Sequence, residues 1–175
     1  MIKWLAAGVL LGVLGVGAFS VTLHETSTEQ FCTSCHEMET PMARLLTTSH
    51  GSNRHGVVAD CADCHIPASM GPKLVRKIEA AREVWGHLLG TLDTPAAYEA
   101  HKPIMQARER ARMVANDSAE CRGCHDTSRW DLQAQSGVAR KQHKAAAEDG
   151  KTCITCHEGL AHPVPRDDEN LFGSL

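Results

Sequence analysis

The longest run of apolar positions lies close to the start of the chain. From Trp4 to Leu23 the sequence contains no charged residue, and charge returns only at Glu25. Twenty helical residues span about 30 Å, the thickness of the hydrocarbon core of a bilayer. The run therefore predicts a membrane-spanning helix. Lys3 precedes the run, so the positive-inside rule predicts a cytoplasmic N-terminus.

A cleaved signal peptide is the alternative interpretation of this segment. The small residues from Gly15 to Ala18 offer a region that a peptidase could cut. However, signal peptides have an apolar core of about 7–15 residues, and this run is longer. We therefore expect residues 1–23 to form an uncleaved anchor, with the remainder of the chain on the other side of the membrane.

Two later segments show the three- and four-residue spacing of apolar positions that is typical of a helix. In the first, Leu74, Ile78 and Trp85 recur between Pro72, a suitable first helical residue, and Gly90, a suitable stop.

The second of these helices is expected to start at Pro95, with Thr94 as its N-cap. It would run to about Val114 and stop at Asn116. Three arginines in its last turns suit the negative end of the helix dipole. Those arginines could also bind haem propionates, although a solvated charged face is the default interpretation of such a group; they are Arg108, Arg110 and Arg112.

The chemistry of the chain is concentrated in one pattern, C-x-x-C-H, which occurs four times and uses all eight cysteines. The thiols are Cys32, Cys35, Cys61, Cys64, Cys121, Cys124, Cys153 and Cys156, and the histidines are His36, His65, His125 and His157. This pattern is typical of covalent haem c attachment, in which two thiols bind the porphyrin and the histidine binds its iron. Zinc sites or disulfides would also use paired cysteines, but neither requires a histidine after every second cysteine. We therefore expect four covalently bound haem c groups.

The composition agrees with a domain built around haem. Apolar residues make up 42% and aromatic residues 4% of the 175 residues, and much of the apolar share lies in the first 23. The rest is poor material for a side-chain core, so we expect haem to form the core and the apoprotein to be largely unfolded. The expected fold is mainly α: one N-terminal transmembrane helix and a small haem-packed domain with long loops. The net charge of −3 gives no reason to expect nucleic-acid binding.

The anchor and the haem domain are expected to meet at the first motif. Residues 24–31 form a short polar connection, so the first haem should sit at the membrane surface, within reach of a lipid-soluble electron donor. The haem domain, 24–175, divides further into two halves of similar plan, 24–90 and 91–175, each with a motif, a histidine and a second motif.

Six-coordinate haems need second axial ligands, and the chain offers seven more histidines for them. His50, His143 and His162 rank first because they precede or flank a motif. His87 ranks next, followed by His55, His101 and His24. Met38, two residues after His36, is a possible thioether ligand of the first iron or an apolar residue that fills a gap.

Beyond the motifs, several stretches resemble one family. They are C-x-x-C-H-E-M at 32–38, C-A-D-C-H-x-P at 61–67 and the segments 77–86, 116–122 and 159–162. Together with the N-terminal anchor, they resemble the NapC/NirT family of membrane-anchored tetrahaem quinol dehydrogenases, over nearly the whole chain. The resemblance implies a bacterial inner-membrane protein of anaerobic respiration with its haem domain in the periplasm. It would oxidise menaquinol or ubiquinol and pass electrons to a periplasmic reductase or its cytochrome subunit. Nitrate reductase is the first candidate for this acceptor, and nitrite and trimethylamine-oxide reductases are the alternatives.

The same resemblance, through the NrfH branch of the family, implies roles for individual residues. Met38 would bind the first iron in place of His36, and Glu83 would cover the other face of that haem. Lys77 would contact the quinol, with Lys73 and Arg76 as other candidates. The implied partners are His143 for the second haem, His162 for the third and His50 for the fourth. Ala68 stands where some members have another histidine, so that ligand cannot be transferred.

The expected chemistry of the first haem follows from these roles. Glu83 would accept protons from quinol, and Lys77 would stabilise charge on its oxygen. The activity would be quinol dehydrogenation by an electron-transfer protein, with no hydrolytic or group-transfer chemistry. Two other functions compete: a tethered electron relay without its own quinol site, and a terminal reductase, which the lack of a large catalytic domain disfavours.

Overall fold

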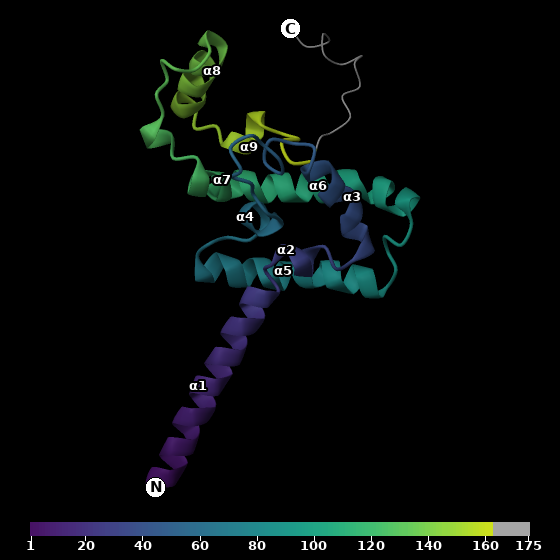
Figure 1. Cartoon of the computed structure of the whole chain (residues 1–175), viewed down its shortest axis with the longest axis vertical. Coiled ribbons are helices and arrows are strands. Elements are labelled where there is room, and N and C mark those ends of the chain that lie inside the picture. Colours follow the sequence, from purple (N-terminus) through teal and green to yellow (C-terminus); the bar gives the residue numbers. More distant parts are fainter. Residues whose placement is uncertain (163–175) are drawn as a thin grey trace.

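The computed structural model describes residues 1–162, and within this part helices are joined by turns and loops without any strand. The first helix, α1, covers Ile2–Glu25 and projects from the rest of the chain as a long rod (Figure 1). It is long and apolar enough to cross a membrane. The expected mainly α fold with one such N-terminal helix is therefore confirmed.

The two longest helices after α1 form the framework of the rest of the described chain. Helix α5 covers Met70–Leu88 and lies crosswise at the end of α1, while α6, Pro95–Ala115, runs beyond it (Figure 1). Both correspond to the helices expected from the apolar spacing. Thr94 accepts a hydrogen bond from the Ala97 amide at 3.1 Å, and Asn116 is the C-cap, so both predicted ends of α6 are confirmed.

Short helices carry the remainder of the domain, and most of them contain part of a motif. They are α2 (Glu29–Cys32), the 3-10 turn η1 (His36–Met38), α3 (Glu39–Leu45), α4 (Cys61–His65), α7 (Ala119–Cys124), η2 (Thr127–Arg129), α8 (Gly137–Glu148) and α9 (Cys153–Cys156). Helix α4 lies between α5 and α6, α7 lies level with α6 at one end of it, and α8 and α9 lie beyond α6 as seen from α1 (Figure 1).

Few side chains are fully buried in the described part of the chain. Leu45 is its buried apolar residue, and the buried polar residues are Arg76, Lys102 and Ser118. The amide of Ile154 donates to the hydroxyl of Ser118 at 3.2 Å, which ties α9 to the start of α7. The expectation of a weak side-chain core is confirmed for the described residues.

Candidate haem centres

Three of the four motifs place both of their thiols on a short helical turn. Helix α4 begins at Cys61, where Asp60 and Asp63 form a capping box, and α9 begins at Cys153. The third motif forms the end of α7. The first motif differs, because Cys32 ends α2 and His36 starts η1, so the chain changes direction inside the motif.

The fold brings each motif histidine against a second histidine, which in three of the four pairs comes from a distant part of the chain. The four ring pairs have centroid separations of 6.0–6.2 Å. The pairs are His36 with His87, His65 with His162, His125 with His50, and His157 with His143. His55 contacts Arg54, and His101 contacts the Ala97 carbonyl of its own helix.

These pairs differ from the pairing that the NrfH-like resemblance implies. His162 lies beside the second motif and not the third, His50 lies beside the third and not the fourth, and His143 lies beside the fourth and not the second. His143 is also backed by Trp130, with ring centroids 4.9 Å apart, and by Gln135 at 2.7 Å from its Nδ1. The structure thus brings the three ranked histidines to motifs, with a changed assignment.

The spacing of the rings matches the requirement of haem. A metal–nitrogen bond of about 2 Å places an imidazole centre about 3 Å from the metal, so two axial imidazoles lie about 6 Å apart. All eight cysteines are free thiols, as covalent attachment requires, and two precede each motif histidine. The fold and these donor sets define a c-type cytochrome with covalently bound haem, attached to a helix that can cross a membrane.

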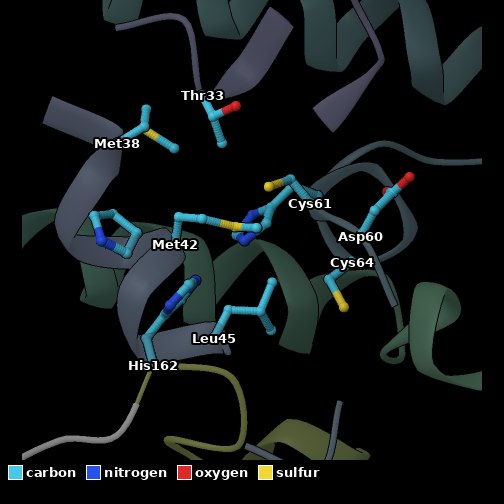
Figure 2. Close-up of a pocket in the computed structure, with 10 residues that line it drawn as sticks. Thr33, Met38, Met42, Leu45, Asp60, Cys61, Cys64 and His162 are labelled. Carbon is cyan, nitrogen blue, oxygen red and sulfur yellow. The ribbon is translucent and has the colours of Figure 1, made fainter. Parts of the chain in front are cut away.

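The second motif surrounds a small hollow of about 40 Å³ (Figure 2). Cys61 and Cys64 line one side, and His162 lies below, so thiols and a distal imidazole meet in the same space. Met38 and Met42 lie across from the thiols, and their flexible thioethers reduce the volume. Met38, the expected ligand of the first iron, thus lies on the wall of the second site.

The first motif contains an acidic bridge. His87 Nδ1 lies 2.8 Å from Glu37 Oε1, and His36 Nδ1 lies 3.6 Å from the other oxygen of the same carboxylate. The Glu37 side chain is only 8% exposed. The hydrogen bond with His87 lowers the pKa of Glu37. Glu37 therefore orients His87, the helix α5 histidine that our ranking placed fourth.

A second acidic bridge holds the His65 ring from α6. His65 Nδ1 lies 2.9 Å from Glu109 Oε1, and Arg112 donates to the same oxygen at 2.7 Å. Burial raises the pKa of Glu109, but the hydrogen bonds with His65 and Arg112 outweigh it and bring the pKa to about 2. Arg112 also donates to the Cys64 carbonyl and to Glu120, which precedes the third motif. One arginine thus connects the second and third motifs.

The two residues expected to act on quinol lie on different sides of α5. Lys77 donates to the carbonyl and hydroxyl of Thr26, just past the end of α1. Partial burial lowers the pKa of Lys77. Glu83 is 55% exposed and pairs with Arg76 at 3.3 Å, which in turn lies 4.0 Å from Glu109. Lys77 therefore lies at the end of α1, while Glu83 joins the charged group that extends from the second motif.

A basic cavity of about 450 Å³ opens between α5 and α6. Arg82, Arg108 and Arg112 line it together with Glu79 and Glu109. Arginine forks suit carboxylates, so the cavity can receive the propionate groups of a haem. The arginines of α6 were expected to be either solvated or propionate ligands, and the structure places two of them in one cavity.

Sequence reasoning missed the two acidic partners of the histidines. Glu37 follows the first motif directly, and Glu109 stands inside the basic run of α6. For Glu109 the sequence did offer a signal. A single acidic residue among arginines on a polar helix is well placed to form ion pairs.

Comparisons with known proteins agree with this class. The family model described as NapC/NirT cytochrome c family, N-terminal region, matches residues 1–167. The denitrification system component NirT of Stutzerimonas stutzeri is 46% identical over 92% of this chain and 81% of its own length. The cytochrome c-type protein NapC of Escherichia coli K12 is 44% identical over 92% and 84%. A putative tetraheme cytochrome of Allochromatium vinosum is 44% identical over 95% and 91%.

The chain therefore belongs to the NapC/NirT cytochrome c family. No solved structure matches it.

Proposed function

We propose that the chain carries four haem c groups, oxidises a membrane quinol at the first motif and passes the electrons to a periplasmic reductase. The observation that carries this proposal is the contact of Lys77 with Thr26. It holds a cationic hydrogen-bond donor where α1 ends, near Cys32 of the first motif. A lipid-soluble donor can reach this position without leaving the bilayer.

The contact between Lys77 and Thr26 also supports the proposed membrane topology. Residues 1–23 would form the anchor with a cytoplasmic N-terminus, and residues 24–175 would form the periplasmic haem domain. The arrangement of Figure 1 supports this division, since α1 projects away from every motif. Within the domain, motif pairs in 24–90 and 91–175 form the two halves, although His162 and His50 each cross from one half to the other.

Chain residues would prepare the quinol for oxidation. Lys77 would donate a hydrogen bond to a quinol oxygen and stabilise the negative charge that develops there. Glu83 would accept a proton, and Arg76 would hold its carboxylate in place. Haem, when bound, supplies the one-electron acceptance that quinol oxidation requires. The separation of Lys77 from Glu83 on α5 implies that charge stabilisation and proton release occur at different edges of the site.

The proposed iron ligands follow the ring pairs at three motifs. They are His65 with His162, His125 with His50, and His157 with His143. Two sets are available at the first motif: Met38, which the family resemblance favours, and His36 with His87, which the ring spacing favours. The His36–His87 pair also supports a second candidate function, a tethered relay, because it would make the four haems alike.

The acceptor is proposed from the relatives. NirT is described as a component of a denitrification system, so reduction of a nitrogen oxyanion is the expected destination of the electrons. A periplasmic nitrate reductase is the first candidate, and nitrite or trimethylamine-oxide reductases are the alternatives. Purified reductases mixed with the reduced chain would rank these acceptors by the rate of haem reoxidation.

The quinol proposal is tested with the full chain in proteoliposomes. Menaquinol or ubiquinol analogues are added, and haem reduction is followed by absorbance in the wild type and in Lys77→Gln. We expect the variant to lose at least tenfold in rate at equal haem content. Lys144→Gln on α8, an exposed lysine far from α1, is the matched control. If neither quinol analogue reduces the haems of the wild type, the quinol proposal is wrong and the tethered relay becomes the better candidate.

A further inference from the structure

Helix α5 has two faces of different character. A helix turns about 100° per residue, so Arg76, Glu83 and His87 share one face. Their contacts with Glu109 and Glu37 direct this face toward the motifs. The opposite face carries Ile78, Trp85 and Leu89, which are seven and four residues apart and so lie in one row.

The opposite face is apolar and uncovered. Ile78 is 76%, Trp85 64% and Leu89 69% exposed. The side of the helix that faces the motifs is the other one, where Arg76 contacts Glu109 and His87 contacts Glu37. A row of large exposed apolar side chains on a helix indicates a surface that contacts another protein or a membrane.

The position of α5 identifies what it meets. The helix lies crosswise at the end of α1, as the layer of the haem domain nearest to that end (Figure 1). Lys77 fixes the two helices to each other through Thr26, directly where the apolar run ends. If α1 spans the bilayer, α5 lies at the level of the lipid headgroups.

We propose that α5 lies flat on the periplasmic surface of the bilayer as an interfacial amphipathic helix. Ile78, Trp85 and Leu89 would enter the boundary between headgroups and acyl chains. Trp85 suits that boundary because its indole is apolar with one polar edge. The occupant of this face is therefore lipid, continuous with the lipid around α1.

The surface contact would fix the tilt and height of the domain above the membrane. A single spanning helix permits rotation about its axis and bending at residues 26–28, whereas a second helix on the surface removes both freedoms. The first motif would then be held at constant distance from the acyl chains. This inference depends on α1 spanning the membrane and not on quinol being the donor.

The test uses single cysteines in the full holo chain, since attached haem consumes the native thiols. Ile78→Cys, Trp85→Cys and Leu89→Cys are labelled with a nitroxide in vesicles of phosphatidylethanolamine and phosphatidylglycerol. Collisions with oxygen, which concentrates in lipid, are compared with collisions with a water-soluble nickel chelate. We expect oxygen to dominate at all three positions. Val138→Cys on α8, equally apolar and 74% exposed, is the control and should favour the chelate.

Two outcomes would overturn the proposal. One is accessibility to the chelate at 78, 85 and 89 equal to that at 138. The other is protection from both reagents with spin–spin broadening, which would mean that a second copy covers the face. The wild-type chain provides a second measurement without substitutions: a photoactivatable phospholipid should crosslink within 78–89, and an absence of crosslinks there counts against lipid contact.

Discussion

His65 and Glu109 are 44 residues apart in the sequence, and their side chains meet at 2.9 Å through the Nδ1 of the imidazole. A carboxylate at this position fixes the ring and makes the opposite nitrogen a stronger donor to a metal. Its negative charge also favours the oxidised state of an iron bound to His65, so the second haem should have a lowered reduction potential.

Replacing Glu109 by glutamine should therefore raise one midpoint potential and leave the other three in place. Potentiometric titration of the full chain in detergent, followed by absorbance and EPR, measures this shift. Glu99→Gln, an exposed acid on the same helix, is the matched control and should move none. If all four potentials stay where they were in Glu109→Gln, the carboxylate has no influence on the iron.

The pairing of His65 with His162 makes a prediction about double variants. His162→Ala should alter the low-spin signal of a single haem, and that haem should be the one whose potential Glu109→Gln shifts. In the double variant of Glu109→Gln and His50→Ala, the two substitutions should instead affect different haems, because His50 lies beside His125 of the third motif. EPR spectra recorded during redox titration separate the two cases. Effects of Glu109→Gln and His162→Ala on different haems would refute the pairing.

The first motif allows Met38 and His87 to be compared directly. Methionine and histidine ligation of ferric haem differ in near-infrared magnetic circular dichroism, so Met38→Ala and His87→Ala identify the ligand. If His87 binds the first iron, His87→Ala changes one haem and Met38→Ala changes none at the first site. His101→Ala, an exposed histidine that contacts only its own helix, should be silent in both spectra.

Acid should disrupt the link between the second and third motifs through its carboxylates. Glu109 has a pKa lowered to about 2, and the pKa of Glu120 is lowered as well, after hydrogen bonds with Arg112 and Asn116 outweigh burial. A carboxylate whose pKa is lower in the folded than in the unfolded state stabilises the fold at pH values above its unfolded-state pKa of about 4.3. This stabilisation is lost as the pH falls toward the pKa of the folded state. Circular dichroism should therefore show unfolding in this acidic window.

Arg112→Gln should move that transition to higher pH, because both carboxylates lose the cation that keeps them ionised. Arg129→Gln provides a control, since this arginine lies in η2 and outside the bridge. A transition at the same pH in wild type and Arg112→Gln would show that other groups control acid unfolding.

The local features of this chain could be predicted from its sequence. The apolar run gives α1, Thr94 and Asn116 limit α6, and the four motifs give the haem class, because each depends on neighbouring residues. The histidine pairs could not be obtained in this way. His162 reaches His65 across 97 positions, and that meeting depends on how α6 turns the chain between them.

The quinol candidates show the same limit. The sequence placed Lys77 and Glu83 on one helix, but it could not show that Thr26 would hold the first and Arg76 the second. Both contacts depend on the angle between α5 and its neighbours. Such angles depend on packing over the whole domain, and the spacing of apolar residues along one helix does not predict them.

Leu45 is the buried apolar residue of the described chain, and this has a consequence for how the cell makes the protein. We expect a copy without porphyrin to remain loosely folded, because so few side chains could hold it closed, and its cysteines would then stay open to haem attachment. Such a copy would also be open to proteases, so the supply of porphyrin should limit how many finished molecules accumulate.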